Sequence, residues 1–547
     1  MSDLTAEPAV AAAGLAVHGA DAVDGATRLR EDLVGRGLPA RLAGKDPALW
    51  GPDAEPTARL RLGWLDTHRR SRELLPQLAE LTAELADLDH VVLVGMGGSS
   101  LAAETIVRTL GRPLTVLDTT DPGRIRAVLA DRLERTVVVV ASKSGATVET
   151  DSHRRAYWQA FLDAGMGEAE AARHFVVVTD PGSPLEAVAH EMGAVVLPAD
   201  PEVGGRYAAL TAFGLVPAAL AGAEVTALLD DAEAFSASLG RDADNPALAL
   251  GAALGAAATG GRGTVALVGD GTGLDGLGDW AEQLLAESTG KAGTGILPVV
   301  VESPVAPGVA GPDVLTVSYG GALAAGDVPG GGCAPDLAVN GPLGAHFLAW
   351  EYATTVAATV LGVDPFDQPD VAASKENTRR ILESGPPTQT PSRTEGAIEV
   401  YAPPGAPADL DGALRHLLDG VDVAGHLAVT AYLDRVADAD AAELRPLLAR
   451  TLGRPVTFGW GPRYLHSTGQ YHKGGPPVGS YLQLTGAVDV DLPVPGRPYS
   501  FGELQAAQAT GDRQALIERG RPVLRLHLTD RAAGLAQLRD AIGRWRA

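Results

Sequence analysis

The chain has 547 residues, of which 46% are hydrophobic and 20% are charged, a composition typical of a folded protein with several domains. Its formal net charge of −24 argues against general binding to nucleic acid or to an anionic membrane, but it leaves room for a locally basic phosphate site. Cys333 is the only cysteine, so neither an intrachain disulfide nor a cysteine metal cluster can form. The sequence contains no long uncharged apolar run and no secretory N-terminus, which predicts a cytoplasmic protein without a membrane span.

In chain order, residues 1–89 are predicted to form an N-terminal helical segment, because leucines recur at helical spacing from 74 to 88. Residues 90–223 alternate apolar runs with helical stretches, the pattern of a doubly wound α/β domain with a parallel sheet. Residues 224–384 repeat this pattern, and a linker rich in Pro and Thr at 384–391 leads to a third, C-terminal α/β domain, 385–547. The expected strands are 91–94, 114–117, 136–140, 175–179, 194–197, 264–268, 296–301, 313–318, 398–401, 427–433, 456–459, 481–484 and 523–528.

The stretch 279–291 predicts an amphipathic helix on which Trp280, Leu284 and Glu287 share one face. Trp280 and Leu284 direct that face inward, so we expect Glu287 at an inner surface near the end of the helix. Burial and the negative end of the helix dipole both disfavour a charged carboxylate there, which suits a general base near pH 7. The alternative is a surface ion pair between Glu287 and Lys291, four residues further on.

Two strand-to-helix turns carry groups that suit an anion. One turn, 95–100, is rich in glycine and serine, and the other, 141–150, offers hydroxyls, amides and one lysine. Glycines let backbone N–H groups approach an anion, and a helix N-terminus adds positive potential. Two such turns from one parallel sheet can converge on one phosphate, although each alone is also a plausible helix cap. The candidate phosphate-binding residues are Gly98, Ser99, Ser142, Lys143, Ser144 and Thr147.

These turns, together with 203–207 and 287–291, occur in the same order as in glucose-6-phosphate isomerases, which have two sugar-isomerase (SIS) domains. The chain resembles that family over about residues 60–380. It is most similar to the long actinobacterial type, also seen fused to transaldolase, which carries an extra region like 385–547. The resemblance implies an α/β fold with two doubly wound SIS-type domains.

The resemblance also implies an activity: interconversion of glucose 6-phosphate and fructose 6-phosphate through a cis-enediol, without metal or cofactor. Glu287 matches the base that moves the proton, and Arg206 matches the arginine beside the enediolate. His346 and Lys375 match residues linked to opening of the sugar ring, and Gln368 matches a glutamine that contacts the substrate. A homodimer is expected, because the family often supplies the histidine across a dimer interface.

Other interpretations remain open from the residues themselves. Arg206 is also compatible with a structural ion pair, His346 with a packed core histidine, and Lys375 with a solvated helix face. At the level of function, the alternatives are a dual phosphoglucose/phosphomannose isomerase and a non-catalytic sugar-phosphate sensor built from SIS domains.

The segment 464–476 packs two histidines, a lysine and three glycines into a short stretch after a predicted strand. The simplest prediction is an ordered structural loop. A metal site using His466 and His472 is conceivable, although no carboxylate lies within the segment. The segment can also be expected to reach the main active site or a neighbouring subunit, which would make His466 and Lys473 important for activity.

Overall fold

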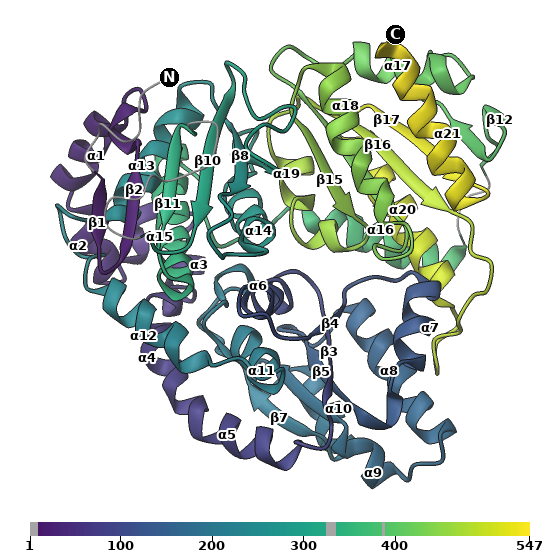
Figure 1. The fold of residues 1–547 in the computed structure, drawn as a ribbon, viewed down its shortest axis with the longest axis horizontal. Helices are drawn as coiled ribbons and strands as arrows, with labels where there is room; N and C mark the ends of the chain where they lie inside the picture. Colours follow the sequence, from purple (N-terminus) through teal and green to yellow (C-terminus); the bar gives the residue numbers. More distant parts are fainter. Residues whose placement is uncertain (1–8, 324–334, 386–388, 547) are drawn as a thin grey trace.

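Three β-sheets with flanking helices form the computed structural model, which describes residues 9–323, 335–385 and 389–546 (Figure 1). Cys333 and the extreme N-terminus lie outside the described residues, as does part of the predicted linker at 384–391. The structure confirms the α/β class with parallel sheets of the doubly wound type.

The first sheet is entirely parallel and has the strand order β4–β3–β5–β6–β7. Its central strands are runs of valine that are buried along their whole length, as expected for a sheet covered on both faces. The strands are β3 (His90–Gly95), β4 (Thr115–Leu117), β5 (Thr136–Ala141), β6 (Phe175–Thr179) and β7 (Val195–Pro198). The helices are α6 (Leu101–Thr109), α7 (Pro122–Ala130), α8 (Val148–Asp163), α9 (Glu168–Arg173), α10 (Pro184–Met192) and α11 (Ala212–Leu220).

The second sheet has the order β1–β2–β11–β10–β8–β9, with a parallel part and an antiparallel edge. The parallel strands are β8 (Thr264–Gly269), β9 (Leu297–Val301), β10 (Val314–Gly320) and β11 (Leu337–Asn340). Its helices are α12 (Val225–Ser236), α13 (Pro246–Thr259), α14 (Leu277–Thr289) and α15 (Leu343–Leu361).

The N-terminal segment departs in part from the helical prediction. It begins with a hairpin, β1 (Val10–Ala12) and β2 (Leu15–His18), and β2 pairs antiparallel with β11. Leu15 and Val17 are buried while their neighbours in β2 are only half-buried, a period of two that suits a strand. Five helices then follow as predicted: α1 (Ala26–Gly35), α2 (Leu38–Ala43), α3 (Glu55–Arg59), α4 (Thr67–Arg70) and α5 (Leu75–Glu84).

The third sheet has the order β12–β13–β17–β16–β14–β15, in which the last four strands are parallel. Its strands are β12 (Arg393–Glu395), β13 (Ile398–Tyr401), β14 (His426–Tyr432), β15 (Val456–Trp460), β16 (Gly479–Gly486) and β17 (Val523–Leu528). Its helices are α17 (Leu410–Asp419), α18 (Leu444–Leu452), α19 (Gly469–Gly474), α20 (Phe501–Glu518) and α21 (Arg531–Gly543). The helix α16 (Val371–Ser384), which was predicted to belong to the second domain, packs against α20.

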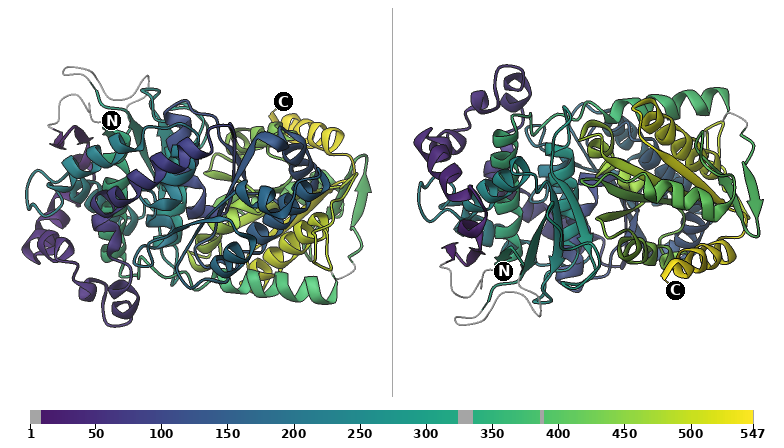
Figure 2. Two further views of the ribbon diagram at one scale, coloured as in Figure 1. Left: turned by 90° about the horizontal axis from the view of Figure 1, so that it is seen from below. Right: turned by 90° about the horizontal axis from the view of Figure 1, so that it is seen from above.

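Each sheet forms one lobe together with its helices, and the first, second and third lobes are numbered as their sheets are (Figure 1). The helices α6, α14 and α19 lie where the three lobes meet. Seen along the vertical axis of that view, the second sheet and the N-terminal helices occupy one end, and the first and third sheets overlap at the other (Figure 2). One large core joins the N-terminal segment, the second sheet and one face of the first sheet, whereas the third sheet has a core of its own. The junction of the three lobes therefore collects residues from all parts of the chain.

Candidate active site

The two predicted anion-binding turns leave neighbouring strands. β3 and β5 pair in parallel, with Gly95 opposite Ala141, so both turns open at the same edge of the sheet. β4 lies on one side of β3 and β5 on the other, which makes this edge the point where the strand order reverses. Ligands of open α/β sheets bind in the crevice at such a point.

The second turn wraps around the N-terminus of α8. The hydroxyls of Ser142 and Thr147 share a hydrogen bond of 2.9 Å, and Ser144 Oγ accepts from the amide of Ala146 at 3.3 Å. Gly145 has a φ of 67°, and a Cβ at this position would lie 2.8 Å from the amide nitrogen of Leu185. A compact turn with hydroxyls and amides at the start of a 16-residue helix is suited to bind a phosphate.

The ammonium of Lys143 in that turn already has partners within the protein. Its ammonium donates to Asp180 Oδ1 at 2.8 Å and to the carbonyl of Asp200 at 3.0 Å. Burial lowers the pKa of Lys143, and the carboxylate of Asp180 opposes that shift. Lys143 is thus part of the turn, but its charge is already paired with a carboxylate.

The first turn approaches a different backbone segment, the short 3-10 helix η7 (Gly205–Tyr207). A Cβ at Gly98 would lie 2.2 Å from the carbonyl oxygen of Gly205 and 2.8 Å from the amide nitrogen of Arg206. Only glycine fits at Gly98, because any side chain would push these segments apart. This contact brings the first turn, which also carries the buried Ser99, against the backbone of the arginine predicted for the site.

Arg206 and Glu287 are brought together. Their side chains are 5% and 8% exposed, and Arg206 Nη1 lies 3.6 Å from Glu287 Oε2. The guanidinium is fixed by donating to Ser288 Oγ at 2.8 Å and to the carbonyls of Pro365 and Asp367 at 2.5 and 2.9 Å. The result is a buried carboxylate beside a cation that cannot turn away.

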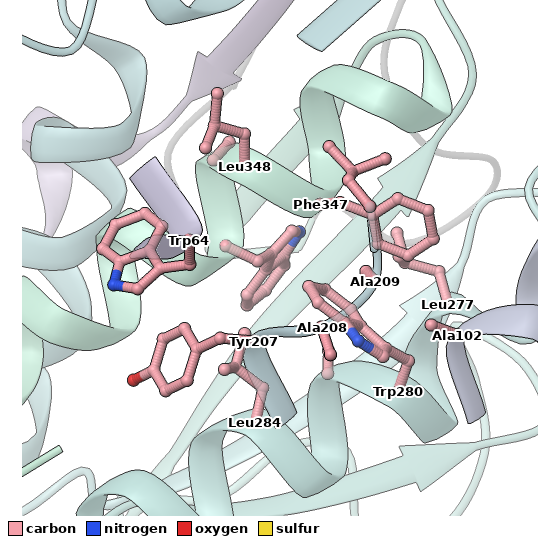
Figure 3. Close-up of a cluster of buried hydrophobic side chains, with 14 of the residues drawn as sticks. Trp64, Ala102, Tyr207, Ala208, Ala209, Leu277, Trp280, Leu284, Phe347 and Leu348 are labelled. Carbon is pink, nitrogen blue, oxygen red and sulfur yellow. The ribbon is translucent and has the colours of Figure 1, made fainter. Parts of the chain in front are cut away.

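Helix α14 presents Glu287 as the sequence predicts. Trp280 and Leu284 are buried on the same face, and Trp280 packs edge-on against Phe347 of α15 with ring centroids 4.8 Å apart (Figure 3). Tyr207, next to Arg206 in the chain, belongs to the same hydrophobic cluster. The large core shared by the N-terminal segment and the first two sheets therefore fixes both the carboxylate and the arginine.

The alternative of an ion pair between Glu287 and Lys291 is wrong. Lys291 is buried and pairs with Asp367 Oδ1 at 2.6 Å, and it also donates to the backbone carbonyls of Asp364 and Asp367. Burial, with the nearby charge of Arg206, lowers the pKa of Lys291 to about 8 despite this carboxylate. Lys291 and Arg206 thus anchor the same loop, which leads to Gln368.

Gln283, four residues before Glu287 on the same helix face, belongs to the site but is not among the residues predicted from the sequence. Its amide nitrogen donates to Glu287 Oε2 at 3.0 Å and to the backbone carbonyl of His466 at 2.8 Å. The helical spacing that placed Glu287 inward applies equally to Gln283 and could have identified it.

The remaining predicted residues lie in three different surroundings. Gln368 and Lys375 are both exposed, Gln368 directly after the anchored loop and Lys375 on α16. His346 is fully buried, its Nε2 donates to the carbonyl of Gly320 at 2.9 Å, and burial lowers its pKa to about 4. Among the described residues, no hydrogen bond or ion pair joins His346 to the other predicted site residues.

Within the described ranges, no group of three histidine, cysteine or acidic side chains is arranged to hold a metal ion, so the conceivable site at His466 and His472 has no third ligand. His472 is buried instead between the rings of Tyr464 and Tyr481. A membrane-spanning helix is also absent from the part of the chain that the structure describes.

The fold is that of an α/β protein of the SIS type, and two turns whose groups suit an anion lie at the switch point of its first sheet. Residues 81–295 match the family model for phosphoglucose isomerase. The glucose-6-phosphate isomerase of Symbiobacterium thermophilum is 30% identical over 388 residues, which are 58% of this chain and 86% of that relative. The chain belongs to the phosphoglucose isomerase family.

Two further comparisons show how far along the chain this similarity extends. A probable glucose-6-phosphate isomerase of Haloarcula marismortui is 36% identical over 224 residues, 40% of this chain, and the match spans about half (51%) of that relative. A crystal structure of a glucose-6-phosphate isomerase from Chlamydia trachomatis shares the fold, with a TM-score of 0.52 and 20% identity over 69% of this chain and 90% of that one.

Proposed function

We propose that the protein interconverts glucose 6-phosphate and fructose 6-phosphate by proton transfer through a cis-enediol. The observation that carries this proposal is the pair of Glu287 and Arg206, buried and 3.6 Å apart, with the backbone of Arg206 packed against the first of the two anion-binding turns. Membership of the phosphoglucose isomerase family supports it. A cytoplasmic location is part of the same proposal.

Each group has a role that its surroundings support. The turns at 95–100 and 142–147 hold the phosphate with backbone amides and hydroxyls. Glu287 removes the proton next to the carbonyl and returns it to the adjacent carbon. Arg206 stabilises the negative charge of the enediolate, and because its other hydrogen bonds already fix it, little reorganisation is needed in the transition state.

Gln368 and Lys375 are proposed to contact the substrate at the exposed side of the site. The proton moves between neighbouring carbons of one substrate, so the proposed chemistry requires neither a metal nor a redox cofactor.

The test is isomerisation of fructose 6-phosphate by the wild type and by Glu287→Gln, with EDTA present. We expect the wild type to turn over and Glu287→Gln to lose about a thousandfold in kcat, within the range for a lost acid–base group. Glu80→Gln, on the exposed face of α5, is the matched control. Binding of 6-phosphogluconate, a sugar phosphate without a carbonyl to isomerise, should survive in all three proteins.

Two other outcomes are informative. Turnover of mannose 6-phosphate by the wild type would make the protein a dual isomerase. If the wild type binds 6-phosphogluconate but converts no sugar phosphate, the protein is a sensor and the catalytic roles of Glu287 and Arg206 are wrong.

A further inference from the structure

The segment 464–476 of the third lobe enters the candidate active site. After β15 it forms the 3-10 helix η9 (Arg463–His466) and then α19, which packs against the end of α14. A Cβ at Gly290 would lie 2.6 Å from the Cα of Tyr471, so the contact is backbone to backbone. The side-chain amide of Gln470 donates to the carbonyl of Gly290 at 3.0 Å and closes the same contact.

His466 faces a carboxylate of the first lobe. Its Nε2 donates to Glu149 Oε1 at 3.0 Å, and Gln508 Nε2 donates to the same oxygen at 2.6 Å. Glu149 is buried and lies two residues after Thr147, the last hydroxyl of the second anion-binding turn. Burial alone would raise the pKa of Glu149, but the charge and hydrogen bond of His466 lower it to about 2. Glu149 is thus an ionised partner that orients the imidazole.

The backbone of His466 is tied to the proposed base. Gln283 donates to the carbonyl of His466 and to the carboxylate of Glu287 through one amide nitrogen. On the other side, a Cβ at Gly97 would lie 2.5 Å from the carbonyl oxygen of His466. The side chain of Gln283 therefore links His466 to Glu287, and the first anion-binding turn packs directly against the backbone of His466.

A charge cluster holds η9 in this position. Arg463 Nη1 contacts Glu104 of α6 at 2.6 Å and also Asp118, which follows β4, while its Nη2 lies 3.4 Å from Asp279 of α14. These carboxylates belong to the helix behind the first turn, to the edge of the first sheet and to the helix that carries Glu287. Arg463 joins all three to the helix that carries His466.

We propose that His466, supplied by the third lobe of the same chain, is the catalytic histidine that opens the sugar ring. This inference rests on the proposed isomerase function. His466 donates a proton to the ring oxygen O5 of glucose 6-phosphate as the bond between C1 and O5 breaks. The C1 hydroxyl gives its proton to water and becomes the carbonyl, and no electron leaves the substrate.

His466 suits this role better than His346. The side chain of His466 remains 18% exposed and lies beside both the anion-binding turns and Gln283. That of His346 is fully buried on a backbone carbonyl. A homodimer stays a prediction, but the site does not need a histidine from a partner.

The first test compares His466→Gln with the wild type and with His416→Gln, an exposed histidine on α17 of the same lobe. We expect His466→Gln to lower kcat for fructose 6-phosphate about a hundredfold, with 6-phosphogluconate still bound and the control unchanged. If the wild type isomerises but His466→Gln stays within about threefold of it, the inference is overturned and the proposed function stands. Absence of isomerisation in the wild type would instead overturn the proposed function.

The second test asks whether the site is shared between chains. Glu287→Gln and His466→Gln are co-expressed, so that any dimer can form as a hybrid. A site completed within one chain gives only the sum of the two residual activities. A site completed across a twofold interface would recover about a quarter of the wild-type activity, because half of the dimers would carry one intact site, and this recovery would overturn the inference.

Discussion

Glu287 and His466 reach the same site by different routes. Glu287 follows from its own helix, whose buried face includes Trp280 and Leu284. His466 depends on a contact with Glu149, 317 residues away in the sequence. Local periodicity determines that a residue faces inward, whereas tertiary packing determines which distant segment meets it there.

The segment 464–476 is itself divided between two tasks. The helix η9, where the segment begins, directs Arg463 and His466 toward the other lobes, and the second part of the segment buries His472 and Lys473 within the third lobe. Lys473 pairs with Asp512 of α20 at 2.6 Å, and both side chains are fully buried. The second part therefore anchors the segment while the first part serves the site.

The largest effect is expected for Lys473→Met, which tests that anchor. The substitution leaves the carboxylate of Asp512 buried without a cation, so the free energy of unfolding should fall by about 3–5 kcal/mol. Denaturant unfolding of the third lobe measures this change in the free energy of unfolding. The double variant Lys473→Met/Asp512→Asn removes both charges and should recover most of the loss. A single variant as stable as the wild type would show that the pair does not anchor the segment.

Arg206→Lys tests the α14 side of the comparison. Lysine cannot bond Ser288 and the carbonyls of Pro365 and Asp367 at once while also facing Glu287, so kcat for fructose 6-phosphate should fall about 10²–10³-fold. The exposed Arg36→Lys serves as the control and should keep full activity. A kcat within tenfold of the wild type would mean that a positive charge alone suffices at this position.

The sequence predicted most of what depends on neighbours along the chain. The valine-rich strands β3 and β5, the two turns that follow them and the inward face of α14 were all expected from composition and period. The hairpin β1–β2 was not, because its short strands are completed by β11, more than 300 residues later. The role of His466 was left among several alternatives for the same reason. No local sequence pattern shows that His466 will contact Glu149 and Gln283, which belong to other lobes.

Gln283→Leu tests the link between the two routes. The substitution removes the amide that donates both to Glu287 and to the carbonyl of His466, so both groups lose one fixed neighbour. We expect kcat to fall about tenfold, the cost of about one hydrogen bond to a charged group. Gln159→Leu, on the exposed side of α8, controls for the change of side chain. An unchanged kcat would show that the two groups are positioned independently.

The smallest effect is expected at Lys143, where the sequence predicted a phosphate contact and the structure shows a pair with Asp180. The ammonium of Lys143 and the carboxylate of Asp180 largely cancel each other's charge at the ligand. Removing both charges with Lys143→Met/Asp180→Asn should therefore change the Kd for 6-phosphogluconate by no more than about threefold. The single variant Lys143→Met should weaken binding more, because it leaves the charge of Asp180 unopposed beside the second turn. If the double variant loses as much affinity as the single one, Lys143 contacts the phosphate directly, and the affinity of the site depends on that cation as well as on the amides and hydroxyls of its turns.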